Sequence, residues 1–343
     1  MTFPNDTRAP GPSTARVTAE FKGAYRVKSG LIELFATITG KQMHQASTRE
    51  DYPAVGDFVE ITPLADDRAV IERILPRRTI LRRKAGAESG PGAQIIATNI
   101  DVAFVIEAVD RDHNLNRLER YCALARDGGI TPAIVLNKTD LIPEEELGAM
   151  LREIARRLAD TDLIPTTTRS GDGLSLLRRY MTTGKTYCFL GSSGVGKSTL
   201  INGLLGDDAI RTVEISSYSG RGKHTTTRRQ MYFLDGGEVV IDTPGIREVG
   251  MADSAAGVAS VFEELTRLGE QCRFADCTHA NEPGCMVLAA VREGKLDKDR
   301  YDNYMSLKKE AEFYELSEQE RREKDRSFGK FVKKAKKSLQ KYD

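Results

Sequence analysis

Residues 191–198 read GSSGVGKS. It matches the pattern G-x-x-x-x-G-K-[ST], follows the strand-like TYCFL and opens the helical KSTLINGLLG. Glycines in such a loop let backbone N–H groups hold phosphates, and the N-terminus of the following helix adds the positive end of its dipole. We therefore expect a nucleotide-binding loop that consists of Gly191, Ser192, Ser193, Gly194, Val195, Gly196, Lys197, Ser198 and Thr199.

Two side chains of this loop have expected roles. Lys197 would reach the β- and γ-phosphates, and the hydroxyl of Ser198 would bind Mg²⁺. A chance glycine-rich turn is the alternative, and the strand before the loop and the helix after it argue against that reading.

A guanine-reading motif precedes this loop in the chain. It follows the strand-like PAIVL and consists of Asn137, Lys138, Thr139 and Asp140. The carboxylate of Asp140 can accept from N1–H and the 2-amino group of guanine. Adenine has neither donor there, so an ATP complex would leave the carboxylate unpaired at a cost of about 1 kcal/mol or more. The motif therefore favours a GTPase over a P-loop ATPase or kinase, and a surface turn is the alternative for NKTD alone.

Two further segments fit the same nucleotide. Asp242-Thr243-Pro244-Gly245 follows the strand-like EVVI, which would place Asp242 near the metal's water shell and the Gly245 N–H near the γ-phosphate. Residues 166–173, TTTRSGDG, fit a loop that closes over guanine, with Thr167 and Thr168 as contacts. That loop reads S-A-K in many GTPases, and this chain departs from it.

A switch loop is expected between the phosphate loop and the D-x-x-G motif. Residues 220–227 read GRGKHTTT, and one threonine there, Thr225 or Thr226, would complete the Mg²⁺ shell. In common GTPases the N-K-x-D motif comes after D-x-x-G, whereas here it comes before the phosphate loop. The motifs therefore predict a circularly permuted domain.

Three expected domains surround these motifs. Five short strand-like stretches in residues 16–83 predict a small barrel, with the OB-fold as first candidate and an SH3-like barrel as the alternative. From residue 99, strands and helices alternate, which predicts a mostly parallel sheet with helices on both faces. The C-terminal part reads as mainly helical, with one helix at 258–268 and a long charged helix at about 297–324. The expected divisions are a disordered tail 1–14, an OB-fold 15–90, a permuted GTPase domain 91–250 and a zinc-binding domain 251–343 with a basic C-terminal helix.

A metal-binding pattern lies in the C-terminal part. Its spacing, C-x₄-C-x-H-x₅-C, provides three thiolates and one imidazole, the closed tetrahedral set of a structural zinc site. Free cysteines in a reduced core are the alternative. The four expected ligands are Cys272, Cys277, His279 and Cys285.

Composition excludes several classes of protein. The 343 residues are 40% hydrophobic, and no apolar run approaches the roughly 20 residues of a membrane span. We expect no signal peptide, and five cysteines argue against a disulfide scaffold, with Cys122 and Cys188 as core residues. The net charge is only +1, but residues 321–343 carry ten Lys or Arg against three carboxylates, a local net charge of +7 that suits phosphate binding or a solvated face.

Together these motifs resemble the ribosome small-subunit-dependent GTPase A family. The resemblance rests on NKTD, GSSGVGKST, GRGKHTTT, DTPGIRE and DCTHANEPGC, in that order after a small barrel. It implies an OB-fold, a permuted GTPase domain and a zinc-binding domain. It also implies a cytoplasmic factor that acts late in maturation of the 30S subunit, contacts 16S rRNA and is stimulated by that subunit. We expect a monomer.

Barrel residues of the types that bind RNA are compatible with this resemblance, with a place in the barrel core or at a solvated edge as the alternative for each: Phe21, Lys22, Tyr25, Arg26 and Lys28. The alternative function is an RNA-binding assembly factor that uses GTP only as a binding switch. Single-turnover hydrolysis with and without 30S subunits would separate the two.

The hydrolytic step points to one further residue. A glutamine after D-x-x-G positions the attacking water in Ras-like GTPases, but Ile246 stands there and its alkyl chain cannot bond water. His224 in the expected switch loop is the candidate for this role, because imidazole can hydrogen-bond a water at neutral pH. The resemblance implies the same, and a histidine that only contacts rRNA or solvent is the alternative.

Overall fold

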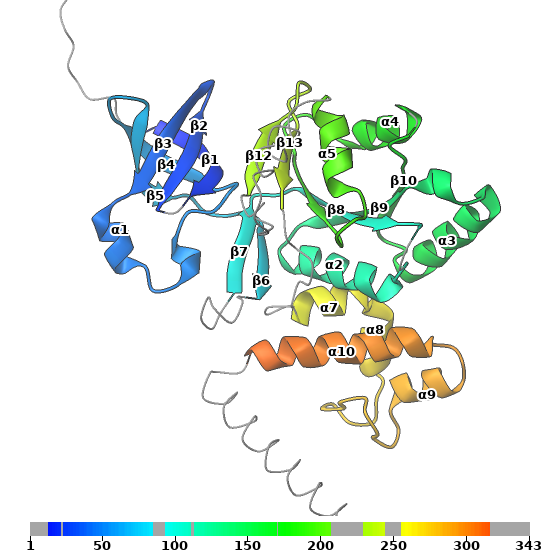
Figure 1. Cartoon of the computed structure of the whole chain (residues 1–343). Helices are drawn as coiled ribbons and strands as arrows, with labels where there is room; N and C mark the ends of the chain where they lie inside the picture. The colour runs from blue at the N-terminus through cyan, green and yellow to red at the C-terminus, as the bar shows by residue number, and fades with distance from the viewer. Residues whose placement is uncertain are drawn as a thin grey trace, which may run out of the picture. The chain divides into compact units, whose positions relative to one another are not determined.

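The computed structural model describes residues 13–21, 23–84, 93–110, 113–169, 171–206, 229–243 and 255–315. They fall into two compact units (Figure 1): one contains the described residues of Met1–Arg83 and Ala93–Val249, the other those of Lys84–Gly92 and Gly250–Asp343. Within these described ranges, no helix is both long enough and apolar enough to cross a membrane.

The chain begins with a closed five-stranded barrel. Its strands are β1 (Ser13–Phe21), β2 (Ala24–Ser29), β3 (Ile32–Ile38), β4 (Phe58–Pro63) and β5 (Arg68–Ile74). They pair in the order β1-β2-β3-β5-β4, and β4 returns to β1 to close the barrel. β3 and β5 run parallel, and the other barrel pairs are antiparallel. This closed five-stranded barrel, with α1 (Gly40–Gln45) and the short turn η1 (Arg49–Asp51) between β3 and β4, is the expected OB-fold.

Alternating side chains fill the barrel. Val17, Val27 and Ile61 are fully buried, and Tyr25 is only 5% exposed among them. Since successive strand residues point to opposite faces, Arg26 and Lys28 lie outside. Tyr25 therefore differs from the other expected RNA contacts, because its ring belongs to the interior side.

The second part of the first unit is a mostly parallel sheet, as predicted. Its strands are β8 (Val102–Ala108), β9 (Thr131–Asn137), β10 (Asp162–Pro165), β11 (Thr186–Leu190), β12 (Gln230–Phe233) and β13 (Val239–Asp242). They pair in the order β10-β9-β8-β11-β13-β12, and only β12 runs antiparallel to its neighbour.

Helices cover both faces of this sheet (Figure 1): α2 lies on one face, and α4 with α5 lies on the other. The helices of this part of the chain are α2 (Leu115–Asp127), α3 (Glu144–Arg157), α4 (Gly171–Tyr180) and α5 (Lys197–Leu205). Phe104 of β8 stacks on Tyr187 at 5.2 Å between ring centroids and packs under α4 and α5. Cys122 and Cys188 are fully buried, as expected, and burial raises the pKa of both thiols.

The barrel strands and the strands of the parallel sheet belong to one continuous hydrogen-bonded sheet. β1 pairs with β12 through Ala19 and Gln230. The guanidinium of Arg16 on β1 donates to Thr186 Oγ1 at 2.9 Å and to the Asn99 carbonyl at 3.1 Å. Burial lowers the pKa of Arg16 to about 10, so this guanidinium remains charged at neutral pH.

A buried ion pair fixes the segment between barrel and sheet. This segment includes β6 (Ile80–Lys84) and β7 (Ala93–Thr98), two strands that the sequence pattern did not reveal. Asp57 is fully buried and accepts two bonds from Arg77, both 2.8 Å, and one from Thr98 Oγ1 at 2.6 Å.

The second unit is helical, as expected, with one correction. Its helices are α7 (Ala255–Val261), α8 (Glu263–Gly269), α9 (Met286–Arg292) and α10 (Lys298–Glu315). The prediction of one helix at 258–268 is wrong, because Phe262 leaves helical geometry at φ −107° and ψ 39°. Its ring is fully buried 5.5 Å from that of Tyr304 on α10, so the tertiary contact outweighs helix continuity. The charged helix is described to Glu315.

Loss of the Asp57 carboxylate should destabilise the first unit. Asp57→Ala leaves Arg77, whose side chain is 12% exposed, as a buried unpaired charge, which costs about 3–5 kcal/mol. The matched control is Glu60→Ala, which breaks the solvent-screened Arg73–Glu60 pair and should change stability far less. Urea unfolding followed by circular dichroism measures both, and equal losses would contradict the structural role of Asp57.

Candidate functional site

The predicted nucleotide motifs meet at one edge of the parallel sheet. The phosphate loop follows β11, NKTD follows β9, the closing loop follows β10 and Asp242 ends β13. Because these four strands are parallel, their carboxyl ends lie at the same edge, where ligands bind in open α/β sheets. Motifs in permuted chain order are therefore brought together in space.

The phosphate loop needs glycine where it approaches other loops. Gly196 precedes α5 with φ +99°, and a Cβ atom there would lie 2.3 Å from Asn137 Nδ2. Gly191 has φ +147°, and a Cβ would lie 2.4 Å from the Ile106 carbonyl. Lys197 Nζ donates to the Gly191 and Ser192 carbonyls at 2.7 and 2.6 Å, which holds the ammonium over the loop.

Asn137 connects the phosphate loop to the closing loop. Its side-chain amide is 1% exposed, and Nδ2 donates to the Val195 carbonyl at 2.9 Å. Thr166 Oγ1 donates to Asn137 Oδ1 at 3.2 Å. Thr139 adds two bonds to the Thr166 carbonyl, from its N–H at 3.1 Å and its hydroxyl at 3.0 Å. One buried amide therefore fixes the spacing of three loops.

The carboxylate of Asp140 faces the closing loop. Thr167 Oγ1 donates to Asp140 Oδ1, and the Arg169 guanidinium lies 3.4 Å from Oδ2. The Arg169 side chain is 78% exposed, so this ion pair is screened by solvent and can be displaced. The closing loop thus lies against the expected guanine acceptor although it does not read S-A-K, with Thr168 exposed beside it.

Asp242 is the last residue of β13 and is half-buried. Burial raises the pKa of its carboxyl, and the nearby Lys197 charge offsets part of that rise. Thr243 anchors the strand end, since its hydroxyl donates to the Phe189 carbonyl at 2.7 Å. Gly245, His224, Thr225 and Thr226 lie outside the described residues, so their roles remain predictions.

Three contacts at this edge have no signal in the sequence. Tyr121 of α2, 2% exposed, shares a side-chain hydrogen bond with Ser192 of the phosphate loop. Lys138 has φ +62°, and its Nζ donates to Asp110 Oδ2 at 2.8 Å. Thr166 connects to Asn137, as described above. In each contact the two residues come from different segments, so no local sequence pattern predicts the contact.

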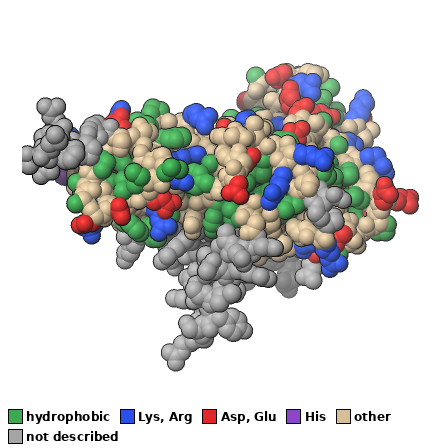
Figure 2. Space-filling model, turned by 90° about the horizontal axis from the view of Figure 1, so that it is seen from above, with side chains coloured by type: hydrophobic (Ala, Val, Ile, Leu, Met, Phe, Trp, Pro, Cys, Tyr) green, Lys and Arg blue, Asp and Glu red, His purple; other side chains and the backbone are tan. Residues whose placement is uncertain are grey.

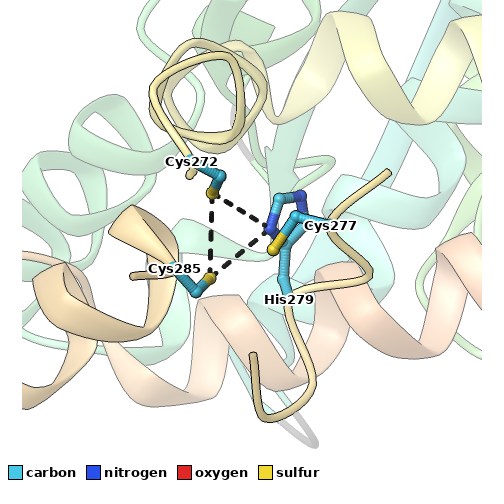
Figure 3. A group of neighbouring side chains, drawn as sticks. All are labelled: Cys272, Cys277, His279 and Cys285. Carbon is cyan, nitrogen blue, oxygen red and sulfur yellow. Dashed lines mark hydrogen bonds between the residues drawn. The ribbon is translucent and has the colours of Figure 1, made fainter. Parts of the chain in front are cut away.

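The second unit brings the four expected metal ligands together (Figure 3): Cys272, Cys277, His279 and Cys285. Their ligand atoms all lie within 4.8 Å of one another. Figure 3 shows that the side chains converge from a helix end, a loop and the start of α9. Such a Cys₃His cluster can hold a metal ion.

The surroundings of the cluster fit thiolate ligands. Backbone N–H groups of Met286 and Leu288 donate to the sulfurs of Cys272 and Cys285, each at 3.4 Å. His279 has φ +65°, and the hydroxyl of Tyr301 donates to its carbonyl at 2.8 Å.

A carboxylate organises the loop that carries Cys277 and His279. Glu282 accepts from the Thr278 hydroxyl and from the backbone N–H groups of Thr278 and Asn281. The Thr278 hydroxyl contributes most to lowering the pKa of Glu282 to about 2.

Comparison with known proteins supports one family. The family described as RsgA GTPase matches residues 74–252. The "Small ribosomal subunit biogenesis GTPase RsgA 2" of Lactiplantibacillus plantarum is 42% identical over 313 residues, which cover 91% of this chain and 87% of that protein. A protein of Opitutus terrae named "Small ribosomal subunit biogenesis GTPase RsgA" is 42% identical over 311 residues, covering 87% and 83% of the two chains.

Solved structures share the architecture. The crystal structure of YjeQ from Thermotoga maritima aligns with a TM-score of 0.65 and 26% identity over 88% of this chain and 98% of that one. A structure titled "YloQ, a circularly permuted GTPase" aligns with a TM-score of 0.63 over 90% and 98% of the two chains, and its 21% identity supports the fold alone. The matched sequence, the permuted motifs and the shared fold together show that this chain belongs to the RsgA family of circularly permuted GTPases.

Proposed function

We propose that this GTPase acts in the cytoplasm in biogenesis of the small ribosomal subunit, and that binding to the subunit stimulates hydrolysis. The observation that carries the proposal is the meeting of the phosphate loop, the guanine motif and the closing loop at one sheet edge, where Asn137 connects them, in a chain whose relatives carry that function in their names. Single-turnover hydrolysis of GTP with and without purified small subunits tests it.

Each expected residue has a proposed task in this reaction. Asp140 reads guanine, Lys197 neutralises phosphate charge and Ser198 binds the Mg²⁺ that a GTPase requires. Ser198 is exposed at the first turn of α5, and Asp242 ends β13, the strand that pairs with β11. The remaining proposed contacts are Gly245 for the γ-phosphate and Thr225 or Thr226 for the metal.

The barrel surface supports RNA as a partner. Phe35 on β3 is 51% exposed, and its ring lies 6.1 Å from that of Phe21. The Arg26 guanidinium lies over both rings, at 5.9 Å from Phe21 and 5.3 Å from Phe35. Figure 2 shows exposed hydrophobic side chains next to Lys and Arg over the barrel, at the left of the view. Aromatic rings beside cations stack bases and hold phosphates, so we propose 16S rRNA as the ligand of this face.

The Cys₃His cluster supports zinc as its metal. With Zn–S and Zn–N bonds of about 2.3 and 2.0–2.1 Å, tetrahedral geometry requires about 3.8 Å between sulfurs and about 3.6 Å from sulfur to nitrogen. The Cys272 and Cys285 sulfurs are 3.9 Å apart, and each lies 3.6 Å from His279 Nδ1. Four protein ligands leave no open position, so the proposed role is structural.

Guanine selectivity should depend on Asp140. Asp140→Asn replaces one acceptor oxygen with a donor that faces guanine's own donors, so GDP affinity should fall about tenfold or more. Xanthine has a carbonyl in place of the 2-amino group, so the same variant should gain affinity for xanthosine diphosphate. Titration with both diphosphates measures this, with the exposed Asp160→Asn as control. Unchanged GDP binding in Asp140→Asn would refute the assignment.

Purified protein should contain one zinc ion per chain. Cys272→Ala and Cys285→Ala should each lose the metal and loosen the second unit, while GDP affinity remains. Elemental analysis gives the zinc content, and Cys122→Ala is the control because that buried thiol lies on α2. A wild-type preparation without zinc, purified in the absence of chelators, would rule the site out.

The stimulated rate should depend on His224. His224→Ala should retain binding of GTP and of the small subunit and lose most of the stimulated rate, because water positioning contributes about 10²–10⁴-fold. Ile246→Gln should not restore that rate. The measurement is turnover at saturating subunit. Full stimulation in His224→Ala would eliminate the proposed role, and no stimulation of the wild type would favour GTP as a binding switch only.

A further inference from the structure

A cavity of about 310 Å³ lies between the barrel and the parallel sheet. Its walls come from the end of β1, from the segment that includes α1 and η1, from β7 and from the residue before β12. The charged and aromatic side chains that line it are Glu20, Phe21, Tyr25, Arg49, Tyr52 and Arg229. Among the described residues, no member of the nucleotide motifs lines it.

One wall carries a hydroxyl that is available to a ligand. Tyr25 is 5% exposed, yet its hydroxyl has no hydrogen-bond partner among the described residues. Burial, and then the charge of Glu20, raises the pKa of this phenol to about 12, so the hydroxyl keeps its proton and can donate. This hydroxyl is therefore a free donor at the cavity wall.

The cavity also holds partly desolvated charges. Arg229 is 15% exposed in its side chain, and its Nη1 lies 3.5 Å from Glu20 Oε2 and 3.2 Å from the Ile95 carbonyl. The described residues provide no partner for its Nε and Nη2. Burial raises the pKa of Glu20 and lowers that of Arg229, but the Glu20 side chain is 42% exposed, so the guanidinium of Arg229 is the more strongly desolvated ion. With Arg49 the wall carries two guanidiniums against one carboxylate, which favours an anionic ligand.

Aromatic walls complete the chemistry. The rings of Phe21 and Tyr52 line the cavity beside these charges. A planar base stacks on such rings, a carboxylate such as Glu20 accepts from an exocyclic amino group, and guanidiniums bind phosphate. The volume lies at the lower end of ligand sites, which run from about 300 to 1,000 Å³, so one nucleotide fits better than two.

We propose that this cavity is a second nucleotide site, which binds a single nucleotide unit whose base carries an exocyclic amino group. Glu20 accepts from the amino group, the Tyr25 hydroxyl donates to the base or sugar, and Arg49 and Arg229 hold the phosphate. This site does not depend on whether the ribosomal subunit stimulates hydrolysis.

Two sources of such a unit share this chemistry. A free nucleotide is one, and a nucleotide splayed out of single-stranded RNA is the other. Phe21 belongs both to the cavity wall and to the aromatic pair with Phe35 on the outer barrel face, so a strand stacked on that face reaches the cavity mouth.

The test uses the full chain saturated with GDP, which blocks the guanine site. Calorimetric titration compares CMP with UMP, because uracil has no exocyclic amino group. CMP should bind about fivefold to tenfold more tightly, the effect of one hydrogen bond of about 1–1.4 kcal/mol. Parallel titrations use six-residue oligo(C) and oligo(U). Binding of CMP without oligo(C) assigns a free nucleotide, and preferential binding of both CMP and oligo(C) assigns an RNA strand.

Three variants connect binding to the cavity. Tyr25→Phe keeps the ring in the barrel core and should weaken CMP about fivefold, with GDP affinity and urea midpoint unchanged. Glu20→Ala should abolish the preference for CMP over UMP, whereas Glu33→Ala, which removes another barrel carboxylate beside an arginine, should keep it. Absence of CMP binding at millimolar concentration, equal affinity for CMP and UMP, or a CMP preference that survives Glu20→Ala would overturn the proposal.

Discussion

The Asn137 side-chain amide donates to the Val195 carbonyl and accepts from the Thr166 hydroxyl. Asn137 and Thr166 are both buried, at 1% exposure each. The nucleotide site depends on this amide, because the phosphate loop, the guanine motif and the closing loop come from three separate segments. An unpaired polar group left in this place costs about 1–3 kcal/mol, so the loops keep one mutual spacing. Gly196 is part of the same constraint, since any Cβ would collide with the amide.

Permutation of the chain leaves this arrangement intact because the sheet edge is defined by strand pairing and not by strand connectivity. β11, β13 and β9 deliver their loops to one edge whatever the order in which they are synthesised. What the permutation does change is the neighbour in sequence: the chain leaves D-T-P-G and continues directly into the segment that carries the Cys₃His cluster. At the other end, β1 pairs with β12, which in turn pairs with β13. Gln230 faces Ala19 on one side and Asp242 on the other, so the barrel is one strand away from the strand that ends at Asp242.

Sequence reasoning located most of this architecture because its signals are local. A phosphate loop, an alternating barrel strand and a Cys₃His spacing each show themselves within a few residues. The break at Phe262 was missed because it depends on the ring of Tyr304, far along the chain. Tyr25 was grouped with possible RNA contacts because its strand mixes aromatic and basic residues, and only the barrel register places its ring on the inner side. The contact of Tyr121 with Ser192 likewise connects a helix to the phosphate loop, and neither segment's own sequence indicates the other as its partner.

The central claim is that these permuted segments form one guanine-specific site. Hydrogen exchange of the backbone amides, followed with and without nucleotide, tests it most directly. GDP should protect three segments together: residues 191–199, 137–141 and 166–169. ADP at the same concentration should protect none of them, because Asp140 would remain unpaired. Protection of the phosphate loop alone, or equal protection by ADP, would contradict the claim.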